Sequence, residues 1–168
     1  MAIPLPREGL RIAVAGPPRS GRTSTLRALE ASARANGLEV VRISGSARDQ
    51  WSHYEDVIGQ QGDGLVLVDD AEMLLDSSLE EATLRWAADG NMHRHLVVAA
   101  DVSDTGTIYR GLIPAALRQK CGVLLNAATA QEGSPWGVAA PVGDLRCPGR
   151  GSMILGGTCT RVQVYAAS

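Results

Sequence analysis

The sequence of 168 residues has almost no lysine, few cysteines and no long apolar stretch. Lys120 is the only lysine among 16 basic residues. Cys121, Cys147 and Cys159 are widely spaced without C-x-x-C pairing, so neither a disulfide framework nor a zinc site is indicated. No apolar run approaches the roughly 18 residues of a membrane span, and the N-terminus lacks a signal-peptide pattern. We therefore expect reduced thiols and a cytoplasmic location, with any membrane association made through other segments.

The chain also lacks an excess of positive charge. Its formal net charge is −2, whereas a domain that binds nucleic acid or an acidic membrane is expected to be basic. We therefore do not expect DNA to be a partner. The length and the 45% content of hydrophobic residues suit one folded unit with a sizeable core, so we expect residues 1–168 to form a single domain.

The stretch GPPRSGRTST resembles a phosphate-binding loop of the pattern G-x-x-x-x-G-K-[ST], with Arg22 in place of the lysine. Such a loop works because its backbone N–H groups and the next helix N-terminus converge on phosphate oxygens, while the Ser/Thr hydroxyl ligates magnesium. The predicted nucleotide-binding residues are Gly16, Pro17, Pro18, Arg19, Ser20, Gly21, Arg22, Thr23 and Ser24. Two simpler explanations stay open: incidental glycines in a strand-to-helix turn, and a general replacement of lysine by arginine along the chain.

The run LVLVDD, from Leu65 to Asp70, ends a predicted buried strand with two carboxylates. Asp69 is the candidate magnesium ligand together with Thr23, if nucleotide binds. Asp70 stands where a glutamate would orient the attacking water, and it is one methylene shorter, so its catalytic role is doubtful. The competing interpretation is that both acids cap the following helix.

Strand and helix patterns alternate along the chain. We predict strands at 10–16, 38–44, 65–70, 95–100 and 121–127, and helices at 22–35, 47–59, 78–89 and 108–118. Residues 131–148 read as a long surface loop, and two final strands form a hairpin around Gly156 and Gly157. This order predicts an α/β fold, with a mostly parallel sheet flanked by helices and a C-terminal edge hairpin.

The order of these segments is similar to the motor domains of the FtsK/SpoIIIE type. It resembles more narrowly the degenerate C-terminal ATPase modules of EccC/EssC, the type VII (ESX) secretion motors. The resemblance covers nearly the whole chain through the segments VAGPPRSGRTSTL, GLVLVDDAEML, HLVVAAD, IYRGLIPAALRQKCGVLLN, PGRGSMIL and TRVQVYA. It implies a RecA-like P-loop NTPase fold, ATP and magnesium as cofactors bound weakly, and one module excised from a larger tandem protein.

The departures from the family pattern fall at chemical positions. Arg22 replaces the lysine, Asp70 the glutamate, and Ser152 the aspartate of a Gly-x-Gly-Asp-Met-Leu turn. The resemblance implies a module with little or no hydrolysis, whose partners are sister ATPase domains and secreted helical proteins carrying a signal sequence. The alternatives are an active Mg-ATP hydrolysing translocase of protein or DNA and, with no arginine-rich lid in evidence, a small nucleotide kinase.

Overall fold

The computed structural model describes residues 9–142 and 149–164. Its strands are β1 (Arg11–Gly16), β2 (Val40–Ser44), β3 (Gly64–Asp69), β4 (Arg94–Asp101), β5 (Cys121–Leu125), β6 (Arg150–Leu155) and β7 (Thr158–Gln163). Its helices are α1 (Arg22–Ala35), α2 (Trp51–Gln60), α3 (Ser78–Ala87), α4 (Val102–Thr105) and α5 (Leu112–Leu117), with 3₁₀ turns η1 (Arg48–Gln50), η2 (Ala71–Leu74) and η3 (Ala130–Trp136).

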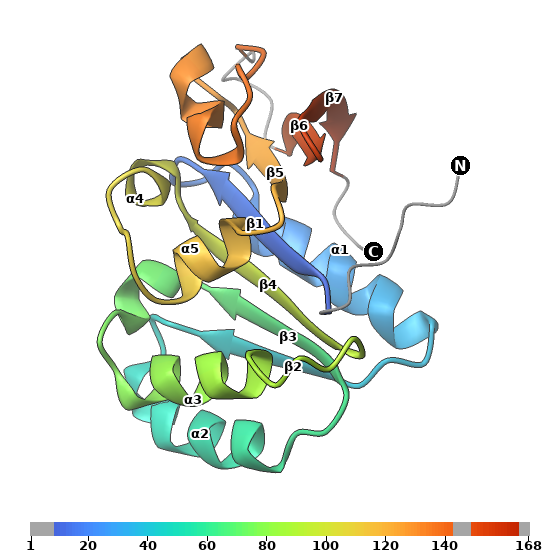
Figure 1. Ribbon diagram of the computed structural model, residues 1–168, viewed down its shortest axis with the longest axis vertical. Coiled ribbons are helices and arrows are strands. Elements are labelled where there is room, and N and C mark those ends of the chain that lie inside the picture. Colours follow the sequence, from blue (N-terminus) through green and yellow to red (C-terminus); the bar gives the residue numbers. More distant parts are fainter. Residues whose placement is uncertain (1–8, 143–148, 165–168) are drawn as a thin grey trace.

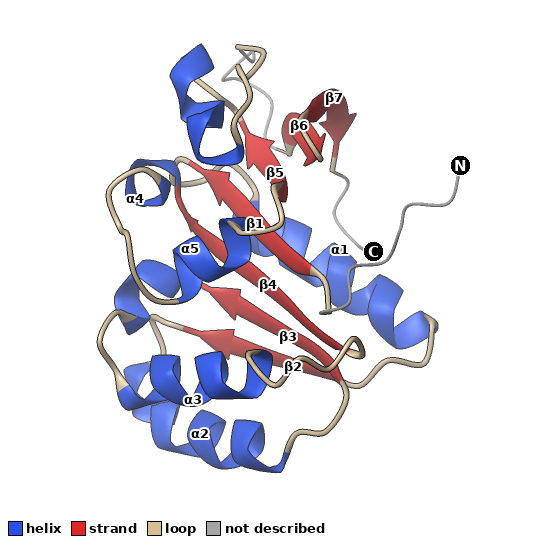
Figure 2. Cartoon of the chain, viewed as in Figure 1, coloured by secondary structure: helices blue, strands red, loops and turns tan. Residues whose placement is uncertain are grey.

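The described strands form one seven-stranded sheet in the order β2-β3-β4-β1-β5-β6-β7 (Figure 2). The first five strands in this order are parallel, while β6 pairs antiparallel with β5 and β7 pairs antiparallel with β6. The predicted C-terminal edge hairpin is thus confirmed. Gly156 and Gly157 turn it with φ of 54° and 88°, the left-handed conformations that a two-residue hairpin turn requires.

Helices cover both faces of the sheet unequally (Figure 1). Alternate residues of the buried strands point to opposite faces: Val66, Val68 and Val98 pack in the core beneath α2, α3 and α5, whereas Leu67 and Val97 pack toward α1. α1 contacts β1, β4 and β3, so it crosses the middle of the sheet. This crossing brings the first turn of α1 toward the end of β3.

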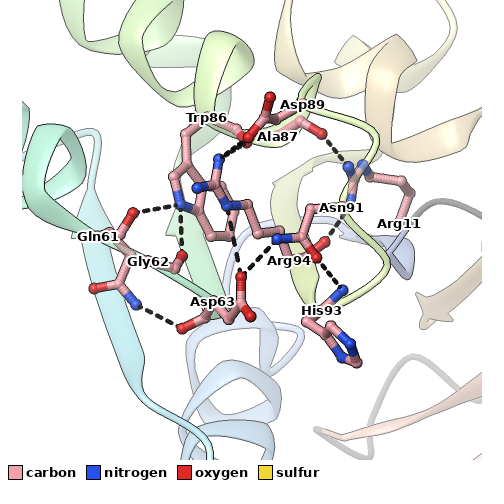
Figure 3. Close-up of polar contacts among 10 residues, drawn as sticks. All are labelled: Arg11, Gln61, Gly62, Asp63, Trp86, Ala87, Asp89, Asn91, His93 and Arg94. Atoms are coloured by element: carbon pink, nitrogen blue, oxygen red, sulfur yellow. Dashed lines mark hydrogen bonds and ion pairs between the residues drawn. The ribbon is translucent and has the colours of Figure 1, made fainter.

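Two arginines lie where the parallel strands β1 and β4 begin (Figure 3). Arg94 lies 5.7 Å from the ring centroid of Trp86 and donates from Nη1 to the Trp86 carbonyl and to Asp89. Arg11 is buried and donates to the carbonyls of Ala87 and Arg94. Both guanidiniums therefore donate hydrogen bonds to main-chain carbonyls at the end of α3. They lie at the amino ends of the parallel strands, away from the carboxyl ends.

Several predicted segments differ from the structure. The helix predicted over 47–59 begins as the 3₁₀ turn η1 and becomes α-helical only at Trp51. The helix predicted over 108–118 is shorter, because Gly111 has a φ of 88° and α5 begins only at Leu112. α4 was not predicted; Asp101 caps it by accepting a hydrogen bond from the Ser103 N–H at 3.0 Å.

The loop predicted over 131–148 begins with η3, whose Trp136 is 1% exposed. A Cβ at Gly122 would lie 2.3 Å from Trp136 Nε1, so the tryptophan packs over a glycine of β5. The first part of the predicted loop, which forms η3, therefore packs against the core. The predicted loop residues 143–148 lie outside the described residues.

Candidate functional site

The loop from Gly16 to Gly21 connects β1 to α1 and depends on both glycines. A Cβ at Gly16 would lie 2.4 Å from Ser20 Oγ and 2.9 Å from Leu125 Cβ. Gly21 is the N-cap of α1 with a φ of 103°, a conformation that other residues rarely adopt. These glycines are therefore required by the geometry of the loop.

The predicted phosphate-binding residues divide between the loop and the helix. Arg22, Thr23 and Ser24 form the first turn of α1, where the N–H groups have no carbonyl partner within the helix. The two prolines of the loop, Pro17 and Pro18, have no N–H to offer, and the Pro17 carbonyl accepts from the Ser20 N–H at 3.2 Å. Main-chain donors for a phosphate would therefore come from Arg19 and from residues 21–24, since the Ser20 N–H is already used within the loop.

The two candidate magnesium ligands are in direct contact. Thr23 Oγ1 donates to Asp69 Oδ2 at 2.7 Å, and Asp69 Oδ1 accepts from the Asp70 N–H at 3.1 Å. The contact spans β4, which lies between β1 and β3, and it forms because α1 crosses the sheet. The sequence correctly predicted that these side chains meet, and their oxygen atoms are the ligand type that Mg²⁺ prefers. Their role toward a metal ion stays a prediction.

Arg22 points to a group of carboxylates at the carboxyl ends of β3 and β4. Its guanidinium lies 3.6 Å from Asp70, 3.9 Å from Glu72 and 4.0 Å from Asp101, and its side chain is 13% exposed. We call Arg22 and these three acids the Arg22 cluster. The distances are those of ionic contact and exceed direct hydrogen-bond length, and Arg22 Nη1 is buried without a hydrogen-bond partner among the described residues.

The acids of this region outnumber the arginine. Burial raises the pKa of Glu72 above its ordinary value, and the neighbouring Asp70 and Asp104 carboxylates add to this, against a lowering by Arg22. Burial and the Asp101 carboxylate likewise raise the pKa of Asp104. The surroundings of Glu72 and Asp104 thus disfavour the ionised form of each carboxyl group.

Asp70, the doubtful catalytic residue, has a left-handed backbone with φ and ψ of 49°. It is the N-cap residue of η2, yet its side chain makes no capping hydrogen bond. The carboxylate pairs with Arg22 instead. The helix-cap interpretation is therefore wrong for Asp70, and its catalytic role is not tested by this geometry.

Sequence reasoning missed Glu72, Asp101 and Gly149 as neighbours of the loop. The Gly149 N–H donates to the Ser20 carbonyl at 2.9 Å, so the start of the C-terminal hairpin is bonded to the phosphate-type loop. Asp101 was detectable, because it ends a buried strand whose carboxyl end must lie beside the loop. Gly149 gave no such signal, because it has no side chain and does not end a predicted buried strand.

Two negative findings apply to the described ranges 9–142 and 149–164. No group of three or more His, Cys, Asp or Glu side chains there is arranged to hold a metal ion. None of the helices there is long and apolar enough to cross a membrane.

Comparison with known proteins finds similarity in structure only. No protein-family model and no curated protein sequence matches the chain. EssC (ATPases 2 and 3) from Geobacillus thermodenitrificans aligns with a TM-score of 0.72 and 14% identity, over 100% of this chain and 39% of that chain. EccC (ATPases 2 and 3) from Thermomonospora curvata, solved in complex with a signal sequence peptide, aligns with a TM-score of 0.64 and 17% identity, over 95% of this chain and 37% of that chain.

The chain has the fold of the EssC and EccC ATPase domains. The RecA-like P-loop fold predicted from the sequence is therefore confirmed. The cytoplasmic domain of EssC aligns as well, with a TM-score of 0.67 and 16% identity, over 94% of this chain and 38% of that chain. The chain thus spans about two fifths of the length of these structures, two of which comprise ATPases 2 and 3.

Proposed function

We propose that this chain is a degenerate ATPase module of a type VII protein secretion motor, which binds nucleotide weakly or not at all and acts through protein contacts. The fold of EssC and EccC ATPase domains and the order of motifs along the sequence support this proposal. The partial coverage of the structural neighbours supports a single RecA-like domain within a larger tandem protein. In such a motor the module would be cytoplasmic, and other segments would reach the membrane.

The Arg22 cluster is the main observation that supports weak nucleotide binding. In an active phosphate loop the lysine is free to approach the β- and γ-phosphates. Here the cation in that position is held among three carboxylates. A triphosphate would enter beside Asp69, Asp70, Glu72, Asp101 and Asp104, with one partly committed guanidinium to offset them, so its binding should be weak.

Hydrolysis should be weaker still. Catalysis of phosphoryl transfer depends almost entirely on positioning and electrostatic stabilisation. The carboxylate of Asp70, which would have to orient water, is paired with Arg22 at 3.6 Å. The planar guanidinium also does not replace a compact ammonium group in the narrow space beside the phosphates.

Titration calorimetry with Mg-ATP, together with a phosphate-release assay, tests this proposal. We expect a dissociation constant weaker than about 100 μM, or no saturable heat, and slow or undetectable turnover. Arg22→Lys should not restore turnover fully, because Asp70 remains short. Turnover of about 1 s⁻¹ or faster by the unmodified chain, the low end for kinases, would contradict the degenerate reading.

The alternative is an active Mg-ATP hydrolysing translocase, and one contact favours it. Thr23 and Asp69 already adopt the pairing that would hold a magnesium ion. In that case Thr23→Val and Asp69→Asn should each abolish turnover, while under the degenerate proposal there is little turnover to lose. The net charge of −2 favours a protein over DNA as the translocated substrate.

The proposed partners are sister ATPase domains and secreted helical proteins. The EccC structure with a signal sequence peptide supports the second kind of partner for a module of this fold. Anisotropy titration with labelled candidate signal peptides, done with and without the neighbouring ATPase module, separates the two. Absence of peptide binding in both formats, with tight association of the modules, would leave only the sister-domain role.

A further inference from the structure

The segment between α4 and α5 presents an aromatic side chain directly to solvent. Tyr109 is 85% exposed, the largest exposure among the large hydrophobic residues exposed in the described ranges. Figure 1 shows this connection curving outward from the body of the domain. Ile108, next to it, is packed against the core and therefore anchors the base of the segment. Tyr109 is thus held out on a supported loop and contributes nothing to the core.

Beside Tyr109 lies an open hollow of about 350 Å³. Most of its lining side chains are apolar, and a threonine, an arginine and a lysine complete the lining. They are Thr105, Ile108, Tyr109, Pro114, Leu117, Pro135, Arg118 and Lys120. No acidic residue is among these described lining residues. The hollow therefore combines apolar surface with positive charge in a chain whose net charge is −2.

The two cations differ from three arginines elsewhere in the chain. Arg85, Arg94 and Arg110 each pair with an acid of this chain, at 3.3, 2.8 and 2.6 Å. Arg118 and Lys120 are exposed, and neither has an ion-pair partner among the described residues. Lys120 also has a φ of 56°, so its position is fixed by a tight turn before β5. Their charges are available to a partner.

We propose that this hollow is a docking site for a protein segment in which an apolar side chain is flanked by carboxylates. The apolar side chain would enter the hollow against Tyr109 and Leu117, and the carboxylates would pair with Arg118 and Lys120. Tyrosine and arginine are the residue types that concentrate binding energy at protein interfaces. Two cations are too few for the phosphate contacts of nucleic acid or for the basic clusters that bind acidic membranes. This inference does not depend on the proposed state of the nucleotide site.

The test is fluorescence anisotropy with two synthetic fluorescein-labelled peptides, one carrying leucine between glutamates and one identical except for glutamine at each glutamate. We expect the glutamate peptide to bind and to lose affinity as salt is raised, and the glutamine peptide to bind at least tenfold more weakly. Tyr109→Ala and the charge reversals Arg118→Glu and Lys120→Glu should each weaken binding by about fivefold or more, because each removes a contact that the proposal assigns to the peptide.

Matched controls lie on other surfaces. Arg34→Glu reverses an exposed arginine on α1, across the sheet, and Met92→Ala truncates another exposed apolar side chain. Both should leave affinity within twofold. All of these side chains are exposed, so circular dichroism and melting temperature should show folded variants.

Three results would overturn the proposal. One is no saturable binding of the glutamate peptide up to about 1 mM, the weak limit of specific association. Another is equal affinity for both peptides. The third is a concentration-dependent dimer, seen by sedimentation and abolished by Tyr109→Ala, which would make the occupant a second copy of this chain.

Discussion

Replacing Arg22 with alanine should destabilise the domain more than truncating an exposed, ion-paired arginine such as Arg34. The guanidinium faces three carboxylates at 3.6 to 4.0 Å and is 13% exposed. Two unit charges about 4 Å apart interact with roughly 4 kcal/mol at an effective dielectric constant near 20. Desolvation of the charges and repulsion among the acids offset most of this attraction in the intact protein.

The alanine variant loses the cation and keeps the acids. Breaking a buried pair by removing one partner costs about 3 to 5 kcal/mol, because an uncompensated charge remains. We expect about 3 kcal/mol here, since Asp70 is 31% exposed and the acids can take up protons. For a domain of this size, that corresponds to a fall in melting temperature of about 6 to 12 °C.

Thermal and urea unfolding at neutral pH measure the effect, with Arg34→Ala as the control. Arg34 pairs with Glu30 at 2.8 Å, a shorter distance than any in the Arg22 cluster, but its side chain is 60% exposed. Its loss should cost less than about 1 kcal/mol, because solvent screens surface pairs. If Arg22→Ala melts within about 2 °C of the unmodified chain, or costs no more than Arg34→Ala, the Arg22 cluster does not stabilise the fold.

Three further predictions concern pH and packing. Glu72 has a raised pKa, so the folded state binds its proton more tightly than the unfolded state does. The free energy of unfolding should therefore rise as pH falls from the raised pKa toward the ordinary 4.5. Glu72→Gln should reduce this pH dependence, measured by urea unfolding across about pH 4 to 7. His95 has a lowered pKa, caused first by burial, so its effect on stability runs the other way. The free energy of unfolding should fall as pH falls from about 6.5 to the lowered pKa, because the unfolded state takes up the proton first. His95→Asn should remove this fall, measured by the same urea unfolding. Trp136→Ala should cost about 3 to 5 kcal/mol by calorimetry, because the ring is fully buried over Gly122 and its removal leaves a cavity; a cost below about 1 kcal/mol would show that η3 is peripheral.

Much of the fold was predictable because the signals are local. The buried strands β3 and β4 are continuous apolar runs, and Gly156-Gly157 marks a hairpin turn. Residues 108–118 misled the helix prediction because apolar spacing continues through Gly111, whose left-handed φ interrupts the helix. The burial of Trp136 was not predictable, because it depends on a glycine in a strand that follows the pattern of any core strand.

The sequence predicted the loop and the Thr23–Asp69 pair of the candidate site, but not the acids that surround Arg22. Thr23 and Asp69 could be paired from the loop motif and the strand end. The direction taken by the Arg22 side chain could not, because an arginine at that position can reach either phosphates or acids. Which group it contacts depends on Glu72 and Asp101, which come from two different strand ends.

The arrangement of parallel strands explains why a cation is needed at position 22 even without a nucleotide. Strands β3 and β4 both end in acids, and parallel topology gathers these ends at one edge of the sheet, beside the first turn of α1. In a nucleotide-loaded ATPase a magnesium ion helps to balance such acids. When nucleotide binds weakly, the balance must come from the chain itself. Arginine suits this task because it stays charged at every pH and its broad, planar group contacts several carboxylates at once, whereas an ammonium is a compact point charge. The surroundings of this loop therefore give an arginine at position 22 a structural role of its own.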